Sequence, residues 1–412
     1  MSTHAQLSPS SAVRWMSCPG SVALCKDLPD TSSPHADEGT AAHFLASECL
    51  EGGQDAITRV GATILVSRKR VEWLTEGWEA GKGATAFVVD ADMALAVQDY
   101  LNYVRDLVRT TGGTLLVEQR LSIADITGEP DAYGTSDVVI LADTELIIVD
   151  LKYGRGVAVV ADDNPQLQIY ALAALREYGL AADFETVRMV IHQPRLGSVS
   201  EWVQTTDQME DFAEEVAEAG YFTRHDDAML NPTEKGCKWC KAKATCPALR
   251  AEVMALLEEV APAVAPVDLL AQAMDKVGMV EAWCKAIRAE LESKLLAGVP
   301  VQGWKLVQGK KGNRAWTDKV AAEEMLKSMR IKHDEMYDYS VISPTSADKL
   351  AKAEIIGPRQ WPKVQALITQ AEGRPSVAPE SDKRPALVMS ATADDFEDVT
   401  DSPVAAETCD LA

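Results

Sequence analysis

Two aspartates and a lysine in the stretch GTSDVVILADTELIIVDLKYG have side chains of the types that carry out hydrolytic chemistry. The two apolar runs on either side of Asp143 and Thr144 predict a β-hairpin, and a turn at these residues places position 137 opposite position 150. Asp137 and Asp150 then face each other, and Lys152 projects from the same face because side chains alternate along a strand. Two opposed carboxylates in apolar surroundings are costly to desolvate unless a cation or a proton compensates their charge.

A divalent metal ion would compensate this charge. Asp137, Asp150 and the main-chain carbonyl of Leu151 offer the oxygen ligands that Mg²⁺ or Mn²⁺ prefers. Such an ion polarises a phosphodiester and activates water, while Lys152 orients that water or stabilises developing negative charge. The alternative is a solvated hairpin end with one salt bridge between Asp150 and Lys152, and the hairpin alone favours neither interpretation.

Four further residues could assist this chemistry, although each also has a purely structural explanation. Gln166 and Tyr170 lie four positions apart, hence on one face of a predicted helix, from which they could reach a scissile phosphate. His43 lies in a second predicted helix and Glu118 in a predicted strand. Taken alone, a Gln and a Tyr four positions apart more often belong to a partly exposed helix face. A single helical histidine is more often a core or surface residue.

The spacing of three cysteines predicts a metal site of another kind. Cys237, Cys240 and Cys246 follow the pattern C-x2-C-x5-C in a lysine-rich segment with little apolar content, so that a bound metal would supply the stability that packing cannot. We expect Cys18 to provide a fourth thiolate, with Cys25 in reserve. Zinc and a 4Fe-4S cluster both accept four thiolates, and the spacing does not choose between them.

The hydrophobic pattern predicts the elements that must position these groups. Runs rich in Val, Ile and Leu predict strands within residues 112–123, 133–142 and 145–154, followed by two more within 185–195 and 198–205. Helices are expected at 37–53, at 93–110 and after Asn164, a candidate N-cap that precedes Pro165. Strands, a helix and further strands around an apolar centre indicate an α/β domain.

Composition excludes several classes of protein. Apolar residues make up 47% and charged residues 25% of the chain, which is typical of a globular protein. Neither a membrane span nor a secretory signal is expected, since no run approaches 18 apolar residues and the N-terminus lacks a basic flank before an apolar core. Eight cysteines without such a signal indicate a reducing compartment, so we expect a cytoplasmic location.

Composition also divides the 412 residues into three parts. Residues 1–249 end with the cysteine run, and residues 250–371 form a smaller α+β domain with a hairpin at 310–313. Residues 372–412 are a disordered tail with seven acidic residues and no basic residue from Ser390 onward. The net charge of −23 argues against indiscriminate binding of polyanions, so any contact with DNA must come from local clusters of basic and aromatic residues.

In their order along the chain, these residues resemble the motifs of the RecB/AddB-type branch of the PD-(D/E)xK nuclease superfamily. The likeness is carried by Cys18, His43, Asp137, Asp150-x-Lys152, Gln166-x3-Tyr170 and Cys237-x2-Cys240-x5-Cys246. This branch includes the CRISPR-associated adaptation nuclease and iron-sulfur exonucleases of phages. Stretches such as IIVDLKYG look particularly close to an uncharacterised phage-borne family of this type.

The resemblance implies a restriction-endonuclease-like fold, with a mixed central sheet flanked by helices and a cysteine cluster that closes the nuclease domain. It implies that the metal ligands are His43, Asp137, Asp150 and the Leu151 carbonyl. Lys152 becomes the catalytic lysine, Gln166 and Tyr170 match the helical motif beside it, and Glu118 becomes an accessory acid. The resemblance also favours a 4Fe-4S cluster over zinc, with the ligands Cys18, Cys237, Cys240 and Cys246.

The expected function is that of a Mg²⁺- or Mn²⁺-dependent deoxyribonuclease, with exonuclease action, that processes DNA ends in phage recombination, repair or replication. For a phage gene, the location would be the host cytoplasm. The expected partners are single- or double-stranded DNA ends and, because the sequence has no G-x4-GK[ST] loop, a separate helicase, annealing or single-strand-binding protein. The alternatives are a non-catalytic DNA-binding recombination scaffold that retains the nuclease fold, and a zinc-stapled interaction protein.

Overall fold

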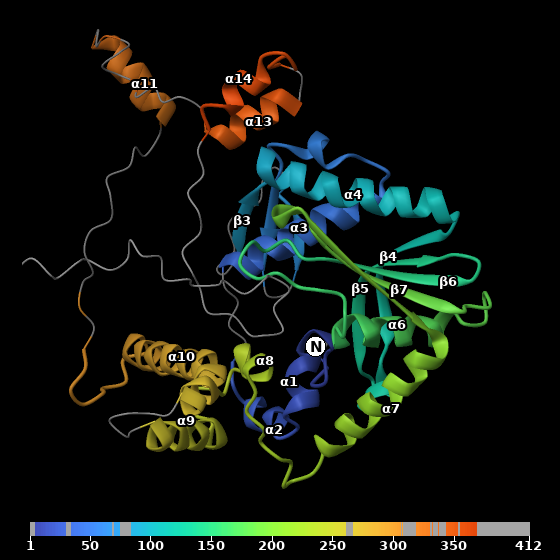
Figure 1. Ribbon diagram of the computed structural model, residues 1–412, viewed down its shortest axis with the longest axis vertical. Helices are drawn as coiled ribbons and strands as arrows, with labels where there is room; N and C mark the ends of the chain where they lie inside the picture. Colours follow the sequence, from blue (N-terminus) through green and yellow to red (C-terminus); the bar gives the residue numbers. More distant parts are fainter. Residues whose placement is uncertain are drawn as a thin grey trace, which may run out of the picture. The chain divides into compact units, whose positions relative to one another are not determined.

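The computed structural model describes most of the chain (Figure 1). The described residues are 5–29, 34–67, 70–74, 84–260, 267–305, 307, 319–329, 332, 337, 343–352 and 355–368. Contacts divide the chain into two compact units, residues 1–308 and residues 309–412. All of the candidate site residues belong to the first unit.

The first unit is built on a mixed sheet of five strands, and all five strands were predicted. The strand order along the sheet is β4-β5-β6-β7-β8. Neighbouring strands are antiparallel except for β6 and β7, which are parallel. The bounds are β4 (Thr114–Ser122), β5 (Tyr133–Leu141), β6 (Glu145–Leu151), β7 (Thr186–Gln193) and β8 (Ser198–Thr205).

Helices cover both faces of this sheet (Figure 1). On one face lie α3 (Pro34–Glu51) and α4 (Ala91–Thr111), and on the other lie α6 (Pro165–Tyr178) and α7 (Thr206–Phe222). Alternate strand residues divide between two cores, so that Val138 packs with α3 and α4 whereas Val139 packs with α6 and α7. The chain is therefore a mixed α/β protein with a buried central sheet.

The predicted helix start at Asn164 is confirmed. The Asn164 side chain accepts hydrogen bonds from the backbone N–H groups of Gln166 and Leu167, which would otherwise lack partners at the beginning of α6. Pro165 occupies the first turn, where its missing N–H costs nothing. This cap fixes the turn of α6 that carries Gln166.

A second, smaller sheet was not predicted. It consists of β1 (Thr63–Val66), β2 (Val71–Trp73) and β3 (Thr85–Val88), in the antiparallel order β2-β1-β3. Its strands are three or four residues long, which is too short for alternation to stand out from the sequence. Ile64 and Val66 add to the core beneath α3 and α4.

The cysteine run packs against the N-terminal segment. This part of the first unit comprises α1 (Ala12–Ser17), α2 (Ser21–Cys25), α8 (Glu234–Lys238), α9 (Pro247–Val260) and α10 (Val267–Leu296). The two chain segments meet at Gly20, whose N–H donates to the Met229 carbonyl at 2.9 Å. A Cβ atom at Gly20 would lie 2.4 Å from the Ala228 carbonyl oxygen, so only glycine permits this approach. Short elements η1 (Pro9–Ser11), η2 (Ala56–Arg59), α5 (Ala124–Thr127) and η3 (Pro194–Leu196) complete the unit.

In the second unit, the described elements are three helices, α11 (Lys319–Ser328), α13 (Pro344–Lys352) and α14 (Trp361–Gln365). The hairpin expected at 310–313 and the acidic tail at 372–412 lie outside the described residues. The division into three parts by composition stays a prediction. Across the described part of the chain, none of the helices is both long and apolar enough to pass through a membrane.

Candidate active site and cysteine pocket

The β5–β6 hairpin has the predicted register. The last pair of the ladder is Val138 with Val149, and the same register places Asp137 opposite Asp150 one residue further on. The two carboxylates therefore come from opposed positions at the point where the paired region ends. Both lie next to apolar strand residues, and Asp150 is only 4% exposed.

Asp150, Lys152 and Gln166 form a closed polar network. The Lys152 ammonium group lies 2.8 Å from Asp150 Oδ2 and donates to Gln166 Oε1 at 3.1 Å, while Gln166 Nε2 donates to Asp150 Oδ1 at 3.2 Å. Burial raises the pKa of Asp150, and Asp137 adds to this rise although Lys152 opposes it. Burial alone would lower the pKa of Lys152, but the contact with Asp150 raises it, so the lysine stays charged.

Asp137 is paired on the α3 side of the hairpin. Its Oδ1 lies 3.1 Å from His43 Nδ1, and its Oδ2 accepts a hydrogen bond of 2.8 Å from the Leu151 N–H. Burial alone would raise the pKa of Asp137, but His43 and this N–H outweigh it and lower the pKa. Burial alone would likewise lower the pKa of His43, whereas the Asp137 carboxylate raises it to about 9.

Glu118 joins this group more closely than the sequence indicated. One ligand atom from each of His43, Glu118 and Asp137 lies within 4.8 Å of the other two, which makes these three residues a candidate metal site. Glu118 is exposed overall, but partial desolvation of its carboxyl raises the pKa to about 7, with Asp137 adding to the effect. Asp150 is instead turned toward Lys152 and Gln166.

The donor set suits a divalent cation. Asp150 Oδ2 is buried, and its partner among the described residues is the Lys152 ammonium group at 2.8 Å. Carboxylate oxygens with one imidazole are ligands that Mg²⁺ and Mn²⁺ accept. Burial raises the pKa of Tyr170, a residue of α6 one turn beyond Gln166, and Asp150 adds to the effect. Of the predicted metal ligands, His43 and Asp137 lie together with Glu118, whereas the roles of all of these residues, Asp150 and the Leu151 carbonyl included, stay predictions.

A large groove lies beside Lys152 and Gln166. Its basic and aromatic lining includes Lys235, Lys238 and Trp239, which come from the cysteine run. Trp239 is 76% exposed, and the Lys238 ammonium lies 5.9 Å from the centre of its ring. The remaining charged lining residues are Arg14, Asp162, Asp163, Asp211 and Glu215.

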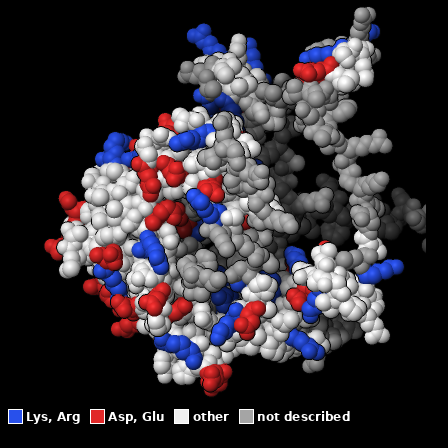
Figure 2. All heavy atoms as spheres, turned by 180° about the vertical axis from the view of Figure 1, so that it is seen from behind, with Lys and Arg blue, Asp and Glu red and all other residues white. Residues whose placement is uncertain are grey.

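Charge of both signs is also mixed across the surface. Figure 2 shows Lys and Arg interspersed with Asp and Glu over one face of the molecule. Contact with a polyanion would therefore depend on particular side chains rather than on a broad basic surface.

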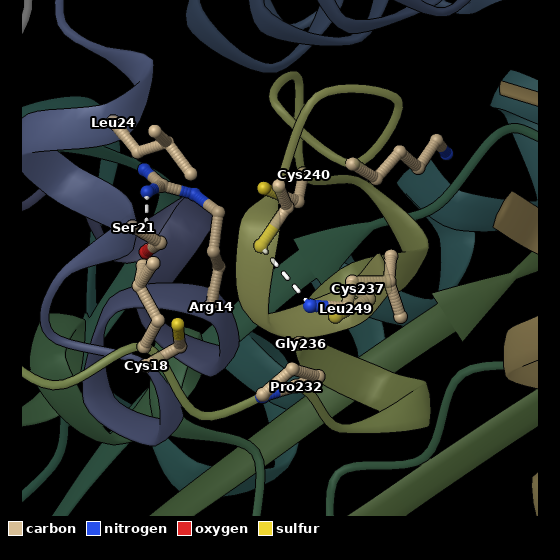
Figure 3. Close-up of a pocket in the computed structure, with 12 residues that line it drawn as sticks. Arg14, Cys18, Ser21, Leu24, Pro232, Gly236, Cys237, Cys240 and Leu249 are labelled. Carbon is tan, nitrogen blue, oxygen red and sulfur yellow. Dashed lines mark hydrogen bonds between the residues drawn. The ribbon is translucent and has the colours of Figure 1, made fainter. Parts of the chain in front are cut away.

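The four predicted cysteine ligands line one pocket (Figure 3). Cys18 comes from the end of α1, and the others come from the segment that includes α8 and leads into α9. Backbone N–H groups donate to two of the sulfur atoms, Asn231 to Cys18 at 3.2 Å and Leu249 to Cys246 at 3.5 Å. Burial raises the pKa of Cys237, and the Lys243 ammonium group in the pocket lining partly opposes this rise. The other two predicted cysteine ligands, Cys237 and Cys240, also line this pocket.

The spacing of the sulfur atoms bears on which metal fits. Tetrahedral zinc with Zn–S bonds of about 2.3 Å holds its thiolates about 3.8 Å apart. No three cysteines among the described residues bring their sulfur atoms within 4.8 Å of one another. The positions of the described cysteines thus do not choose between zinc and an iron-sulfur cluster.

Cys25, predicted as a reserve ligand, lies closer than the sequence indicated. Its Sγ is 3.7 Å from that of Cys240, and both side chains are buried. This contact lowers the pKa of Cys25 and raises that of Cys240. Two further residues of these sites, Tyr100 and Arg14, had no motif that could have marked them in the sequence.

The comparisons with known proteins do not assign a function. A family model described as "Protein of unknown function (DUF2800)" matches residues 4–385, so the chain belongs to this family. Among solved structures, the chain is similar to one titled "Crystal structure of SSO0001", with 16% sequence identity and a TM-score of 0.22. That match covers 36% of this chain and 67% of the other. The function must therefore be argued from the residues of the site.

Proposed function

We propose that this chain is a divalent-metal-dependent deoxyribonuclease of the RecB type, which hydrolyses phosphodiester bonds at DNA ends with exonuclease action. The observation that carries the proposal is the meeting of His43 from α3, Asp137 and Asp150 from a hairpin, and Lys152 with Gln166 beside a groove. A solvated hairpin end with one surface salt bridge would not explain why Asp150, which is only 4% exposed and pairs with Lys152, lies beside a second acid. The restriction-endonuclease-like fold is part of the same proposal.

The proposed metal ligands are His43, Asp137, Asp150 and the Leu151 carbonyl, with Glu118 as a further carboxylate. A bound Mg²⁺ or Mn²⁺ ion would polarise the scissile phosphodiester and favour ionisation of the attacking water. Lys152, which Asp150 keeps charged, borders the groove and would stabilise negative charge as it develops on the phosphate. Gln166 holds Lys152 and Asp150 in their relative orientation, because it hydrogen-bonds to both.

For the cysteine pocket, we propose a 4Fe-4S cluster bound by Cys18, Cys237, Cys240 and Cys246, with zinc as the alternative. All four thiols line one pocket, as a cluster in which each thiolate binds a different iron atom requires. The N–H groups that point at two of these sulfur atoms are also suited to a negatively charged cluster. The cluster would tie the N-terminal segment to the end of the nuclease domain.

The proposed substrate is a DNA end that enters the groove. The exposed ring of Trp239 offers a stacking surface, and Lys235 and Lys238 offer charges for the phosphate backbone. Because opening a duplex requires energy from elsewhere, a helicase, annealing or single-strand-binding protein is the proposed partner. The smaller C-terminal domain and the acidic tail are the parts that we propose for such contacts.

The proposal is tested by incubating anaerobically purified protein with end-labelled single- and double-stranded DNA and Mg²⁺ or Mn²⁺. We expect degradation that chelation of the metal abolishes and that Asp150→Asn reduces by a factor of about 10³ or more, because the buried metal and lysine contacts are lost. Asp143→Asn makes the same change at the exposed hairpin turn and should leave the rate unchanged. Equal activity of wild type and Asp150→Asn would exclude the proposed active site.

A further inference from the structure

A small pocket lies against Asp137 beneath α3 and α4. Its lining includes His43, Tyr100, Glu118, Asp137 and Leu151, and it has room for about one water molecule. Lys152 and Gln166 instead line the large groove. The small pocket thus adjoins the candidate metal site without belonging to the groove.

Tyr100 brings a buried hydroxyl group to this pocket. Its side chain is 1% exposed, and its Oη has no hydrogen-bond partner among the described residues. The ring packs edge-on against His192, with the ring centres 5.7 Å apart, so the hydroxyl is held in place. Burial raises the pKa of Tyr100, and nearby carboxylates add to the rise, so the hydroxyl remains a proton donor. A buried hydroxyl without a partner is costly to keep unless something outside the protein chain accepts its hydrogen bond.

Glu118 reaches the same pocket through an unusual backbone conformation. Its φ is +48°, in the left-handed region that residues with a side chain rarely adopt within a strand. The pairing of β4 with β5 continues on both sides, from Val117 to Gln119. Val117 and Glu118 consequently both line the pocket, whereas Gln119 accepts a hydrogen bond from Tyr178 of α6. Regular alternation along the strand would direct the Glu118 carboxylate away from the pocket. The strained backbone instead turns this carboxylate toward it.

A single water molecule would satisfy both groups. The Tyr100 hydroxyl needs an acceptor, and a water beside the exposed Glu118 can accept from Tyr100 and donate to the Glu118 carboxylate. Buried waters occur where two to four polar groups surround a space of this size, and here His43 and Asp137 are also in the lining.

We propose that Tyr100 is a positioning residue of the metal site, whose hydroxyl donates to one buried water that in turn donates to the Glu118 carboxylate. The inference rests on the proposed function, because the bridge would hold Glu118 and Asp137 in the geometry that a divalent cation needs. Tyr100 acts through the water and the carboxylates and does not touch the DNA.

The test is the substitution Tyr100→Phe, with Tyr103→Phe as its matched control on the same helix. Tyr103 donates to Glu201 at 2.6 Å, away from the pocket, and also packs on His192. The measurements are Mn²⁺ affinity and stoichiometry without DNA, and the thermal unfolding midpoint of the metal-free protein. We expect Tyr100→Phe to bind Mn²⁺ about tenfold more weakly with little change in the midpoint, since partners of metal ligands have effects of this size. Tyr103→Phe should leave Mn²⁺ affinity unchanged.

A raised midpoint with unchanged Mn²⁺ affinity would overturn the inference, because it would show that Phe merely removes an unpartnered hydroxyl. Two Mn²⁺ ions per chain, falling to one in Glu118→Gln, would also overturn it, since the pocket would then hold a cation. A double-mutant cycle of Tyr100→Phe and Glu118→Gln gives a further readout: effects joined through one water are not additive, and additive effects exclude the bridge. None of these measurements uses nuclease activity, so an inactive wild type would contradict only the proposed function.

Discussion

At the scale of single residues, the two aspartates of the hairpin have opposite electrostatic environments. The pKa of Asp137 is lowered by His43 and by a backbone N–H, whereas that of Asp150 is raised by burial. Pairs of acids with diverging pKa values are characteristic of sites that divide tasks between chemically identical groups. We infer that Asp137 is the permanently ionised ligand and that Asp150 depends on Lys152, or on a cation, to remain ionised.

The protonation of His43 gives a prediction about metal binding. In the metal-free protein, the pKa of His43 is raised to about 9, so its pairing with Asp137 stabilises the fold below the ordinary pKa of histidine and is lost as the pH rises through about 9. A metal ion requires neutral imidazole and must displace this proton. At about pH 8, we therefore expect Mn²⁺ binding to release about one proton, and at about pH 10 almost none.

Calorimetry in buffers of different ionisation enthalpy measures this release directly. His43→Gln should bind Mn²⁺ more weakly and with less proton release at about pH 8, because the imidazolium proton is absent; any release that remains would come from Glu118, whose raised pKa His43 no longer lowers. Proton release as large as in the wild type would mean that another group carries the proton.

At the scale of elements, the sequence allowed most of the site's framework to be predicted. The two apolar runs and the turn between them at Asp143 and Thr144 fixed the hairpin register and hence the opposition of Asp137 and Asp150. The N-cap at Asn164 fixed the start of α6 and hence the position of Gln166. These features could be predicted because they depend on local periodicity and on capping chemistry, both of which are visible in a short stretch of sequence.

Features that depend on tertiary packing could not be predicted in this way. Tyr100 is one of several buried residues of α4, and nothing in the helical pattern shows that its hydroxyl reaches the site. The positive φ of Glu118 interrupts an otherwise regular strand without a glycine to mark it. The contact between Cys25 and Cys240 joins positions separated by 215 residues, which cysteine spacing alone cannot reveal.

The packing of α1 and α2 near α8 gives a prediction about the fourth cluster ligand. Cys18 receives a hydrogen bond from Asn231 and lines the cysteine pocket, whereas Cys25 contacts the Cys240 sulfur from outside that lining. We expect anaerobically purified wild type to be brown, with about four iron and four sulfide ions per chain. Cys18→Ser should lose this iron and its visible absorbance, and Cys25→Ser should retain both.

Iron and sulfide analysis together with absorbance spectra distinguishes the alternatives. Cys49→Ser is the control, because Cys49 is buried in the core beneath α3 and α4. Loss of the cluster in Cys25→Ser but not in Cys18→Ser would exchange the roles of the two cysteines. A colourless wild type that contains one zinc ion would favour the zinc alternative.

At the scale of the whole molecule, the net charge of −23 must be reconciled with a polyanionic substrate. The acidic residues repel DNA at a distance, and salt weakens this repulsion together with any attraction. The groove brings a few suitable side chains together. Lys235, Lys238 and Trp239 line the same groove as Lys152 and Gln166. Binding would then depend on a few contacts, so single substitutions should have large effects.

The last prediction concerns these few contacts. We expect Lys235→Glu with Lys238→Glu to weaken binding of a single-stranded oligonucleotide, and to reduce the slope of log affinity against log salt by about 1.4, since each phosphate contact contributes about 0.7. Trp239→Ala should weaken binding about tenfold with little change in that slope, because stacking on an exposed ring is largely independent of salt. Lys285→Glu with Arg288→Glu, on exposed positions of α10, makes the same change in net charge outside the groove lining. If both charge reversals weaken binding equally, net charge rather than the groove governs affinity, and the proposed path of the DNA is wrong.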